Sequence, residues 1–364
     1  MAGQIEQVIE RRIWVLTNGR LGDLKQMQIL ASHLGWPTEV KRISLRSRVR
    51  LGIEALAPLL LDRSQSDRLA GPWPAIVVTA AASLTPIALW IRKRSGHRTK
   101  LVHIGRPAGS LRHFSLVVTS PQFLLQGTEN IIQLPLPLTD AHQIGPTQSD
   151  CDTLDRLERL PKPRTAVLVG GRSPPHLFSA SDARDLSRRV LQLVRRSGGS
   201  LLITTSPRTG KAVEAALFAD VADIPCFFHK WSDQARIQNP YKTILHVADR
   251  FIVTCDSVSM IADAVATGKP TYVHDLPERP RLRDILVTWL SRHQSETSRW
   301  RFANPIRWLF SIGTLYTQAD RRELLRQLRM QGVVQEWPPL QEDRPDDSAA
   351  RYWAALRELT SQKE

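Results

Sequence analysis

The chain has 364 residues, of which 42% are hydrophobic and 23% charged, and its formal net charge is +15 at neutral pH. This length and hydrophobic content fit two ordinary domains, each with a substantial core, and they exclude a disordered or fibrous protein. The positive charge attracts polyanions, whether nucleic acid, anionic lipid or phosphorylated small molecules.

Short apolar, β-branched runs alternate with helix-length segments along the chain, a pattern typical of parallel sheets with helices on both faces. In the first half we expect strands at residues 13–16, 39–43, 76–79, 100–104, 116–119 and 131–134. A second series of expected strands follows at residues 166–169, 200–204, 226–229, 251–254 and 271–273. The predicted fold class is therefore α/β, with two Rossmann-like parallel-sheet domains.

Residues 135–164 separate the two series; they are polar and rich in Pro, Asp and Gln, which indicates a domain junction. We expect a basic N-terminal domain over residues 1–140 and a linker over 141–164. A C-terminal domain follows over residues 165–330, and a second linker with a C-terminal helix over 331–364. The Trp- and Arg-rich residues 289–309 and a helix near 321–330 complete the second domain or cross back to the first in this prediction. The C-terminal helix is expected over residues 349–359, because its apolar residues share one face.

Two basic stretches, at residues 41–50 and 92–100, interleave Lys and Arg with apolar side chains. Each Lys or Arg near an anionic lipid surface contributes about 1 kcal/mol, so this pattern favours peripheral contact with an anionic membrane. The sequence has no zinc-finger spacing, RNP-like aromatic motif or heptad basic region, so we expect no nucleic-acid partner.

Residues 74–91 carry no charge and have almost the length of a transmembrane helix. A β-rich run, a small-residue turn and Pro86 divide them, which predicts a strand, a loop and a helix instead. The N-terminus lacks the apolar core of a signal peptide, and the three cysteines show no C-x-x-C spacing. We therefore expect a cytoplasmic protein that contacts the cytoplasmic face of a membrane.

Four loops of the second half carry residues suited to a phosphorylated ligand, which in open α/β sheets binds beyond the carboxyl ends of the strands. They are a Gly-Gly-Arg-Ser turn whose amides can face a phosphate, a hydroxyl-rich run with an Arg, an Asn-Pro-Tyr turn, and an Asp with two Ser. The residues expected to bind the ligand are Gly170, Gly171, Arg172, Ser173, Thr204, Thr205, Ser206, Arg208, Asn239, Tyr241, Asp256, Ser257 and Ser259. Simpler interpretations are a helix N-cap run for residues 204–209 and an ordinary turn for 239–241.

Several motifs together resemble one known family: NGR near the N-terminus, VHIGRP, LVGG, TTSPRT, NPY and ADRFIVTCDSVSMIADAVATGKP. The family is described as mitochondrial fission (elongated mitochondria) proteins, nucleoside-diphosphate-sugar epimerases and GT-B glycosyltransferases, and the resemblance covers about residues 13–290. It implies a GT-B-like fold, in which two Rossmann-like domains face a cleft, and a nucleotide sugar as substrate. The last motif also resembles the donor-site helix of GT-B enzymes, where an acidic residue binds the ribose; Asp263 occupies that position.

Loops of the first half supply candidates for acceptor chemistry. The residues expected to bind the acceptor are Asn18, Gly19, Arg20 and Arg106. An inverting GT-B transferase needs a base for the acceptor hydroxyl, for which Asp23 is the first candidate and His103 the second. The simpler interpretations are a helix N-cap for Asp23, a core histidine bonded to the backbone for His103, and surface charges for the two arginines.

A D-x-D spacing at residues 150–152 lies in the predicted linker, so we expect no metal ion, and no cofactor apart from the nucleotide sugar as substrate. The leading hypothesis is transfer of a sugar from a nucleotide donor in the C-terminal domain to a lipid-linked or cell-envelope glycan acceptor in the N-terminal domain. Two alternatives stay open. One is a nucleoside-diphosphate-sugar epimerase, which needs no acceptor; the other is a non-catalytic, membrane-associated adaptor of the mitochondrial-fission type.

Overall fold

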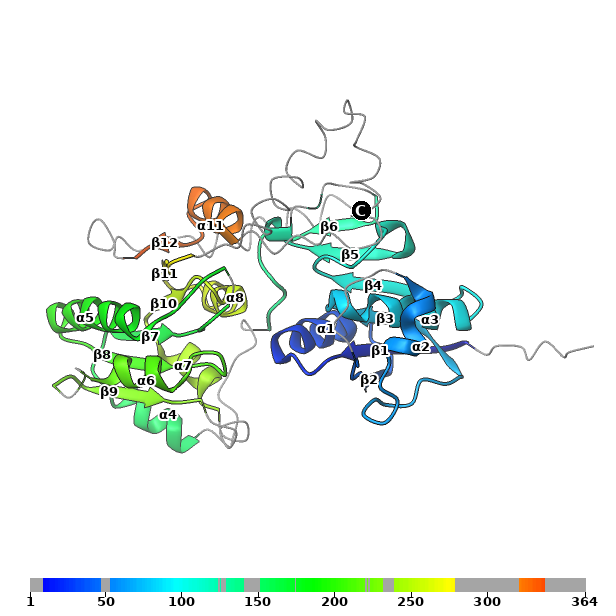
Figure 1. Cartoon of the computed structure of the whole chain (residues 1–364). Coiled ribbons are helices and arrows are strands. Elements are labelled where there is room, and N and C mark those ends of the chain that lie inside the picture. Colours follow the sequence, from blue (N-terminus) through cyan, green and yellow to red (C-terminus); the bar gives the residue numbers. More distant parts are fainter. Residues whose placement is uncertain are drawn as a thin grey trace, which may run out of the picture. The chain divides into compact units, whose positions relative to one another are not determined.

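A computed structural model describes residues 9–46, 53–123, 125, 129–140, 151–173, 175–219, 221, 223–231, 239–278 and 321–337. These residues form two six-stranded sheets with helices between successive strands (Figure 1). Every pair of neighbouring strands in the two sheets is parallel. The prediction of an α/β protein with two Rossmann-like domains is confirmed.

The first sheet has the strand order β2-β1-β3-β4-β5-β6. Its strands are β1 (Ile9–Thr17), β2 (Thr38–Arg42), β3 (Trp73–Thr79), β4 (Lys100–Ile104), β5 (Leu116–Thr119) and β6 (Ile131–Gln133). The helices of this unit are α1 (Leu21–His33), α2 (Ala57–Leu60) and α3 (Thr85–Arg94), and its 3₁₀ turns are η1 (Glu54–Leu56), η2 (Ala82–Leu84), η3 (Leu111–His113) and η4 (Pro121–Phe123). Each strand predicted for this half of the sequence is confirmed, with small shifts at its ends.

Alternate side chains of the first sheet bury its two faces against different helices. Ile13 belongs to the same core cluster as Met27 of α1, whereas its neighbour Trp14 belongs to the cluster of Ile87 on α3. The uncharged residues 74–91 are thus the buried strand β3 and most of α3, with Pro86 in the first turn of that helix. In the described part of the chain no helix is long and apolar enough to span a bilayer.

The second sheet has the strand order β12-β11-β10-β7-β8-β9. Its strands are β7 (Arg164–Leu168), β8 (Ser200–Thr204), β9 (Cys226–His229), β10 (Arg250–Thr254), β11 (Thr271–His274) and β12 (Gln335–Glu336). Its helices are α4 (Cys151–Glu158), α5 (Ala180–Ser197), α6 (Lys211–Phe218), α7 (Tyr241–Val247), α8 (Val258–Ala266) and α11 (Arg321–Met330). The strands predicted for the second half and the helix near residues 321–330 are confirmed.

Two features differ from the sequence prediction. The described residues divide into two compact units, one ending at Leu138 and the other beginning at Thr139. The stretch predicted to be a linker contains helix α4, which belongs to the second unit, so that prediction is wrong over those residues. Strand β12 was not predicted, and the predicted features at residues 289–309 and 349–359 lie outside the described residues.

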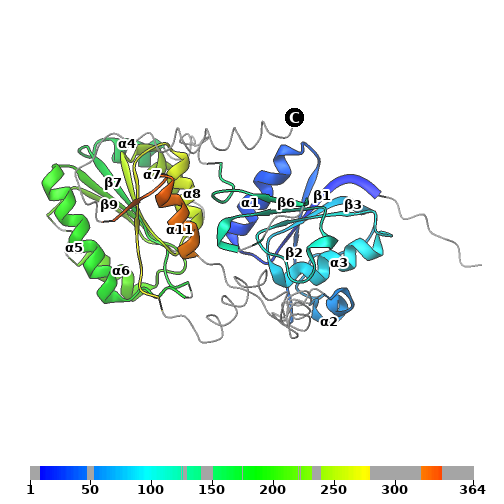
Figure 2. The ribbon, with the colours of Figure 1, turned by 90° about the horizontal axis from the view of Figure 1, so that it is seen from above.

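The strand order of the second sheet reverses direction between β7 and β10. From β7 the chain moves outward to β8 and β9, and it then returns to place β10 on the other side of β7. Helices α5 and α6 cover one face of the sheet, and α7 and α8 cover the opposite face (Figure 2). The loops that follow β7 and β10 therefore lead to opposite faces at a topological switch point, the position where open α/β sheets bind ligands.

Candidate functional site

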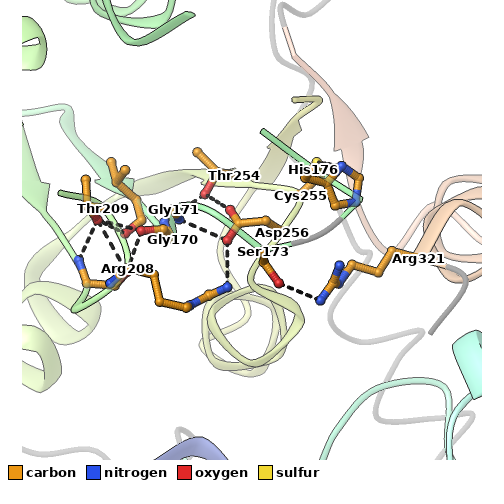
Figure 3. A network of polar contacts seen from close by, with 12 residues as sticks. Gly170, Gly171, Ser173, His176, Arg208, Thr209, Thr254, Cys255, Asp256 and Arg321 are labelled. Carbon is orange, nitrogen blue, oxygen red and sulfur yellow. Dashed lines mark hydrogen bonds and ion pairs between the residues drawn. The ribbon is translucent and has the colours of Figure 1, made fainter. Parts of the chain in front are cut away.

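Asp256 is the centre of a polar network at this switch point (Figure 3). One carboxylate oxygen accepts a hydrogen bond from Thr254 Oγ1 at 2.7 Å, and the other accepts one from the Gly171 amide at 2.9 Å. The second oxygen also lies 3.1 Å from a guanidinium nitrogen of Arg208. Burial raises the pKa of Asp256, and the Arg208 charge opposes that rise. One buried carboxylate thus joins the loops that follow β7, β8 and β10.

The two glycines after β7 allow this close approach. A Cβ atom at Gly170 would lie 2.4 Å from both carboxylate oxygens of Asp256. A Cβ atom at Gly171 would lie 2.3 Å from the backbone of Arg208. Both distances are well below van der Waals contact, so a larger residue at Gly170 would displace the Asp256 carboxylate, and one at Gly171 would displace the backbone of Arg208.

The backbone amides of the glycine turn are occupied by acceptors within the protein. The Gly170 amide donates to Thr254 Oγ1 at 2.8 Å, the Gly171 amide to Asp256, and the Arg172 amide to the carbonyl of Arg208 at 3.1 Å. The expectation that these amides face a phosphate is therefore wrong. The Arg172 side chain is exposed at the same edge.

The hydroxyl-rich loop after β8 closes against the same turn. The hydroxyls of Ser206 and Thr209 both donate to the carbonyl of Gly170. Helix α6 has Gly210 as its N-cap, so the simpler interpretation of these residues as the helix cap is also wrong. These hydrogen bonds hold the loop, which includes Arg208, against the glycine turn.

Thr204 and Thr205 also make internal contacts. Thr204 Oγ1 lies 3.2 Å from His229 Nδ1, and Thr205 Oγ1 donates to Glu214 Oε1 at 2.7 Å. Thr205 also accepts a hydrogen bond from the Trp231 amide at 2.8 Å. Both threonines are buried, so the structure assigns them to the packing of β8 against its neighbours rather than to a ligand surface.

Two guanidinium groups approach the switch point from different elements. The Arg208 side chain is 39% exposed although its partner Asp256 is fully buried, so it presents a fixed cation to solvent. Arg321, the first residue of α11, donates to Ser173 Oγ at 2.9 Å, and its charge also acts on Asp256. Arg321 was missed in the sequence because only the fold brings it to Ser173. The charges of both Arg208 and Arg321 thus act on the Asp256 carboxylate.

The amino end of α8 adds a second source of positive potential. Amides in the first turn of any helix have no intrahelical acceptor, and the helix dipole favours an anion there. Ser257 is the N-cap residue, and within the described residues its side chain caps none of those amides. Ser257 is buried and Ser259 is exposed, so Ser259 is the hydroxyl that a ligand can reach first.

Asp263, the residue expected to bind a ribose, has an internal position. It is buried, and its carboxylate accepts hydrogen bonds from Thr139 and, at 3.0 Å, from the Tyr241 hydroxyl. Burial, together with the Asp263 charge, raises the pKa of Tyr241 well above its usual value. Asn239 accepts a hydrogen bond from the Tyr241 amide at 3.0 Å and so supports the start of α7.

A cavity of about 530 Å³ opens beside the cluster, between the loop after β11 and α11. Its lining includes Cys255, next to Asp256 in sequence, and His176, Asp275 and Glu278. Burial raises the pKa of the Cys255 thiol to about 12, so the thiol is neutral at physiological pH and is no nucleophile. His176 Nδ1 lies 3.7 Å from the Cys255 sulfur and 3.6 Å from a Glu278 carboxylate oxygen.

In the first unit, the predicted acceptor residues lie directly after β1. Asn18, Gly19 and Arg20 are all exposed, and Gly19 has a positive φ of 88° that favours glycine. Asp23 is half-buried in the first turn of α1, whose N-cap is Arg20, so the simpler interpretation of Asp23 as the N-cap is wrong. Burial raises the pKa of Asp23, and the Arg20 charge opposes that rise.

His103, the second candidate base, is a core residue. It is fully buried on β4, and its ring stands edge-on to Phe114 with centroids 5.5 Å apart. Burial lowers the pKa of His103 to about 3, which makes it a weak base that no substrate can touch. Arg106 is half-buried and donates to the Phe123 carbonyl at 3.1 Å, so this guanidinium supports its own loop. Among the described residues no three His, Cys, Asp or Glu side chains gather as metal ligands.

Similarities to known proteins agree with the sequence motifs. The family model described as "Mitochondrial fission ELM1" matches residues 22–294. The mitochondrial fission protein ELM1 of Arabidopsis thaliana is 29% identical over 288 residues, which cover 73% of this chain and 64% of the plant protein. The chain thus aligns with less than two thirds of the length of that relative.

The similar solved structures are more distant. Os79 from O. sativa, in complex with UDP, is 10% identical with a TM-score of 0.45, over 96% of this chain and 100% of Os79. The UDP-GlcNAc 2-epimerase of Neisseria meningitidis, bound to UDP-GlcNAc, is 10% identical with a TM-score of 0.42, over 97% of this chain and 100% of the enzyme. The family assignment rests on the sequence match, which extends over well more than half of the chain: this protein belongs to the Mitochondrial fission ELM1 family.

Proposed function

We propose that the switch point of the second unit binds the diphosphate of a nucleotide sugar and that the protein is a glycosyltransferase. The observation that carries the proposal is the pair of guanidinium groups, Arg208 and Arg321, whose charges both act on Asp256, the residue directly before the N-cap of α8. Guanidinium groups and helix amino ends are the two protein features that best recognise phosphate oxygens.

The position of Arg208 is fixed before any ligand arrives. Its guanidinium contacts buried Asp256, and its loop is bonded to the glycine turn through Ser206 and Thr209. A cation that is already ordered loses little side-chain entropy when it binds an anion, which strengthens binding. This arrangement supports a site built for a charged ligand rather than a solvated surface arginine.

The sugar and the acceptor have separate candidate places. The cavity beside Cys255 offers about 530 Å³ next to the cluster, enough for a sugar ring, and it is lined by hydrogen-bonding side chains. In the first unit, the exposed Asn18, Gly19 and Arg20 are the proposed acceptor-binding residues, with Asp23 as general base. Burial raises the pKa of Asp23, which makes it a stronger base than an exposed carboxylate. The proposed acceptor is a lipid-linked or cell-envelope glycan.

A nucleotide-binding experiment tests the donor site. We would measure the unfolding temperature of the purified protein with UDP, GDP, CDP, ADP and dTDP and their common sugars. A ligand at about a hundred times its Kd adds about 2.7 kcal/mol of stability, which corresponds to about 5–10 °C for a unit of this size. Arg208→Gln and Arg321→Gln should each weaken binding about thirtyfold, since a hydrogen bond to a charged group contributes about 2 kcal/mol.

Arg188→Gln is the matched control, because Arg188 is an exposed arginine on α5 whose described ion pair, with Asp185, is a surface contact. Equal shifts in Arg208→Gln, Arg321→Gln and the control would contradict the assignment of the site. A protein that ignores every nucleotide would instead favour the non-catalytic adaptor.

An activity assay separates the two enzymatic hypotheses. Incubation with the nucleotide sugar that binds should release free nucleoside diphosphate only when a membrane fraction supplies the acceptor. Asp23→Asn should lower that rate at least about a hundredfold, the usual contribution of a general base. Conversion of one nucleotide sugar into another without membranes, followed by proton NMR, would favour the epimerase.

A further inference from the structure

A surface of the first unit, away from the proposed acceptor loop, combines exposed apolar side chains with cations. Helix α2 and the carboxyl end of α3 lie side by side there (Figure 1). They enclose a shallow hollow of about 410 Å³, which we call the α2–α3 hollow. It is lined by Glu54, Ala55, Pro58, Trp90, Lys93 and Arg94. Leu59, next to Pro58 on α2, is 70% exposed.

Leu59 has the highest exposed fraction among the leucines of the described chain. The hollow next to it is also lined by Trp90, an aromatic residue with a polar ring nitrogen. Trp90 is half-buried: one side packs edge-on to Trp73 with centroids 6.0 Å apart, and Arg94 lies over its ring at 5.9 Å. Trp and Arg or Lys in contact are typical of side chains that sit at the boundary between lipid headgroups and acyl chains.

Three basic residues, Arg92, Lys93 and Arg94, lie in the last turn of α3. Basic residues at a helix carboxyl end interact favourably with the helix dipole, and Arg92 also donates to the His113 carbonyl at 2.8 Å. Lys93 and Arg94 are both exposed, like Leu59 of the neighbouring helix. Glu54, at 2.7 Å from Lys93, is the acid among the residues that line the hollow, so the surface stays positive.

The orientation of α3 sets the surface apart from the acceptor loop. Helix α3 runs antiparallel to the strands that it connects, so its carboxyl end lies at the amino edge of the sheet, near the start of β4. Asn18, Gly19 and Arg20 follow β1 at the opposite, carboxyl edge. A partner bound at the α2–α3 hollow therefore leaves the acceptor loop uncovered.

We propose that the α2–α3 hollow docks on a membrane surface that contains anionic lipid. Lys93 and Arg94 contact the phosphates of the headgroups, and Leu59 and Trp90 enter the layer between headgroups and acyl chains. Charge complementarity selects anionic over neutral lipid, and the apolar side chains distinguish a membrane from a soluble polyanion such as a nucleic acid. This inference is independent of the proposed donor site.

Co-sedimentation with vesicles tests the proposal. The full chain should bind vesicles of phosphatidylcholine mixed with phosphatidylglycerol and not vesicles of phosphatidylcholine alone, and added salt should weaken the binding. The double variant Lys93→Gln/Arg94→Gln should lose about thirtyfold in partitioning, since each cation contributes about fivefold. Leu59→Ser should lose about tenfold, because it removes the apolar contact of an exposed side chain that the fold does not need.

Two variants with the same kinds of substitution at other places serve as controls. Leu34→Ser changes a 42% exposed leucine after α1, on the opposite face of the same sheet, and Arg188→Gln/Arg189→Gln removes two exposed cations of α5. Both controls should bind vesicles like the unmodified protein. Binding to neither vesicle type, equal binding to both, equal losses in the controls, or retention by duplex DNA without vesicle binding would each overturn the proposal.

Discussion

The close approach of Gly170 to Asp256 allows a quantitative test of the network at the switch point. An alanine Cβ at position 170 would lie 2.4 Å from both carboxylate oxygens, so the carboxylate has to move. It would then lose the hydrogen bonds from Thr254 and Gly171 and its contact with Arg208. Separating a buried charge from its partners costs about 3–5 kcal/mol, and we expect Gly170→Ala to lower the free energy of unfolding by about that amount.

Gly198→Ala is the matched control for this substitution. Gly198 ends α5 with a φ of 67°, and a Cβ atom there would meet nothing within 4 Å. The control therefore measures left-handed backbone strain alone, about 1–2 kcal/mol. Urea-induced unfolding of both variants, followed by circular dichroism, gives the comparison.

A double-mutant cycle refutes or supports the steric argument directly. Asp256→Ala removes the atoms that the new methyl group would meet, so Gly170→Ala should cost much less in that background than in the unmodified protein. We expect a coupling free energy of about 2 kcal/mol or more. Additive effects within about 0.5 kcal/mol would mean that Gly170 and Asp256 are not in contact, and the network as described would be wrong.

Two further predictions concern buried titratable groups. Burial lowers the pKa of His103 to about 3, so between pH 6.5 and pH 3 only the unfolded chain binds that proton. The free energy of unfolding should therefore fall as the pH drops below 6.5, by about 2 kcal/mol at pH 5. His103→Gln should flatten this dependence in urea unfolding at pH 7 and pH 5; parallel curves would exclude His103 as its source. Tyr241→Phe removes a donor to buried Asp263 and should cost about 1.5–3 kcal/mol. Tyr272→Phe, whose buried hydroxyl has no partner among the described residues, should change stability little; similar losses in the two variants would contradict the role of the Tyr241 bond.

The strands could be predicted from the sequence wherever burial of both sheet faces leaves an unbroken apolar run. Strand β12 contains only Gln335 and Glu336, and it is a strand because Tyr272 of β11 pairs with Gln335. Helix α4 was taken for a linker because its residues are mostly polar and Leu157 alone among them is buried. In both cases the structure depends on a neighbour that lies far away in the sequence.

The chemistry of the glycine turn could not be predicted for the same reason. A Gly-Gly-Arg-Ser sequence after a buried strand is compatible with a phosphate loop and with a turn closed on a carboxylate of its own protein. The difference lies in Asp256, 85 residues away, which accepts the Gly171 amide. The polar cluster at the switch point was predictable in its position, whereas the contacts within it were not.

The structure also changes the role that the sequence indicates for Asp256. A carboxylate in direct contact with a phosphate would repel it, and the Asp256 side chain is fully buried behind Arg208. Its contacts to Thr254, Gly171 and Arg208 hold the guanidinium at the surface, so we propose that Asp256 is a positioning residue and that the cation contacts the ligand. Loss of binding in Asp256→Ala would therefore report on the placement of Arg208. For that reason substitution of Arg208 and Arg321, rather than of the acid, is the direct test of the proposed donor site.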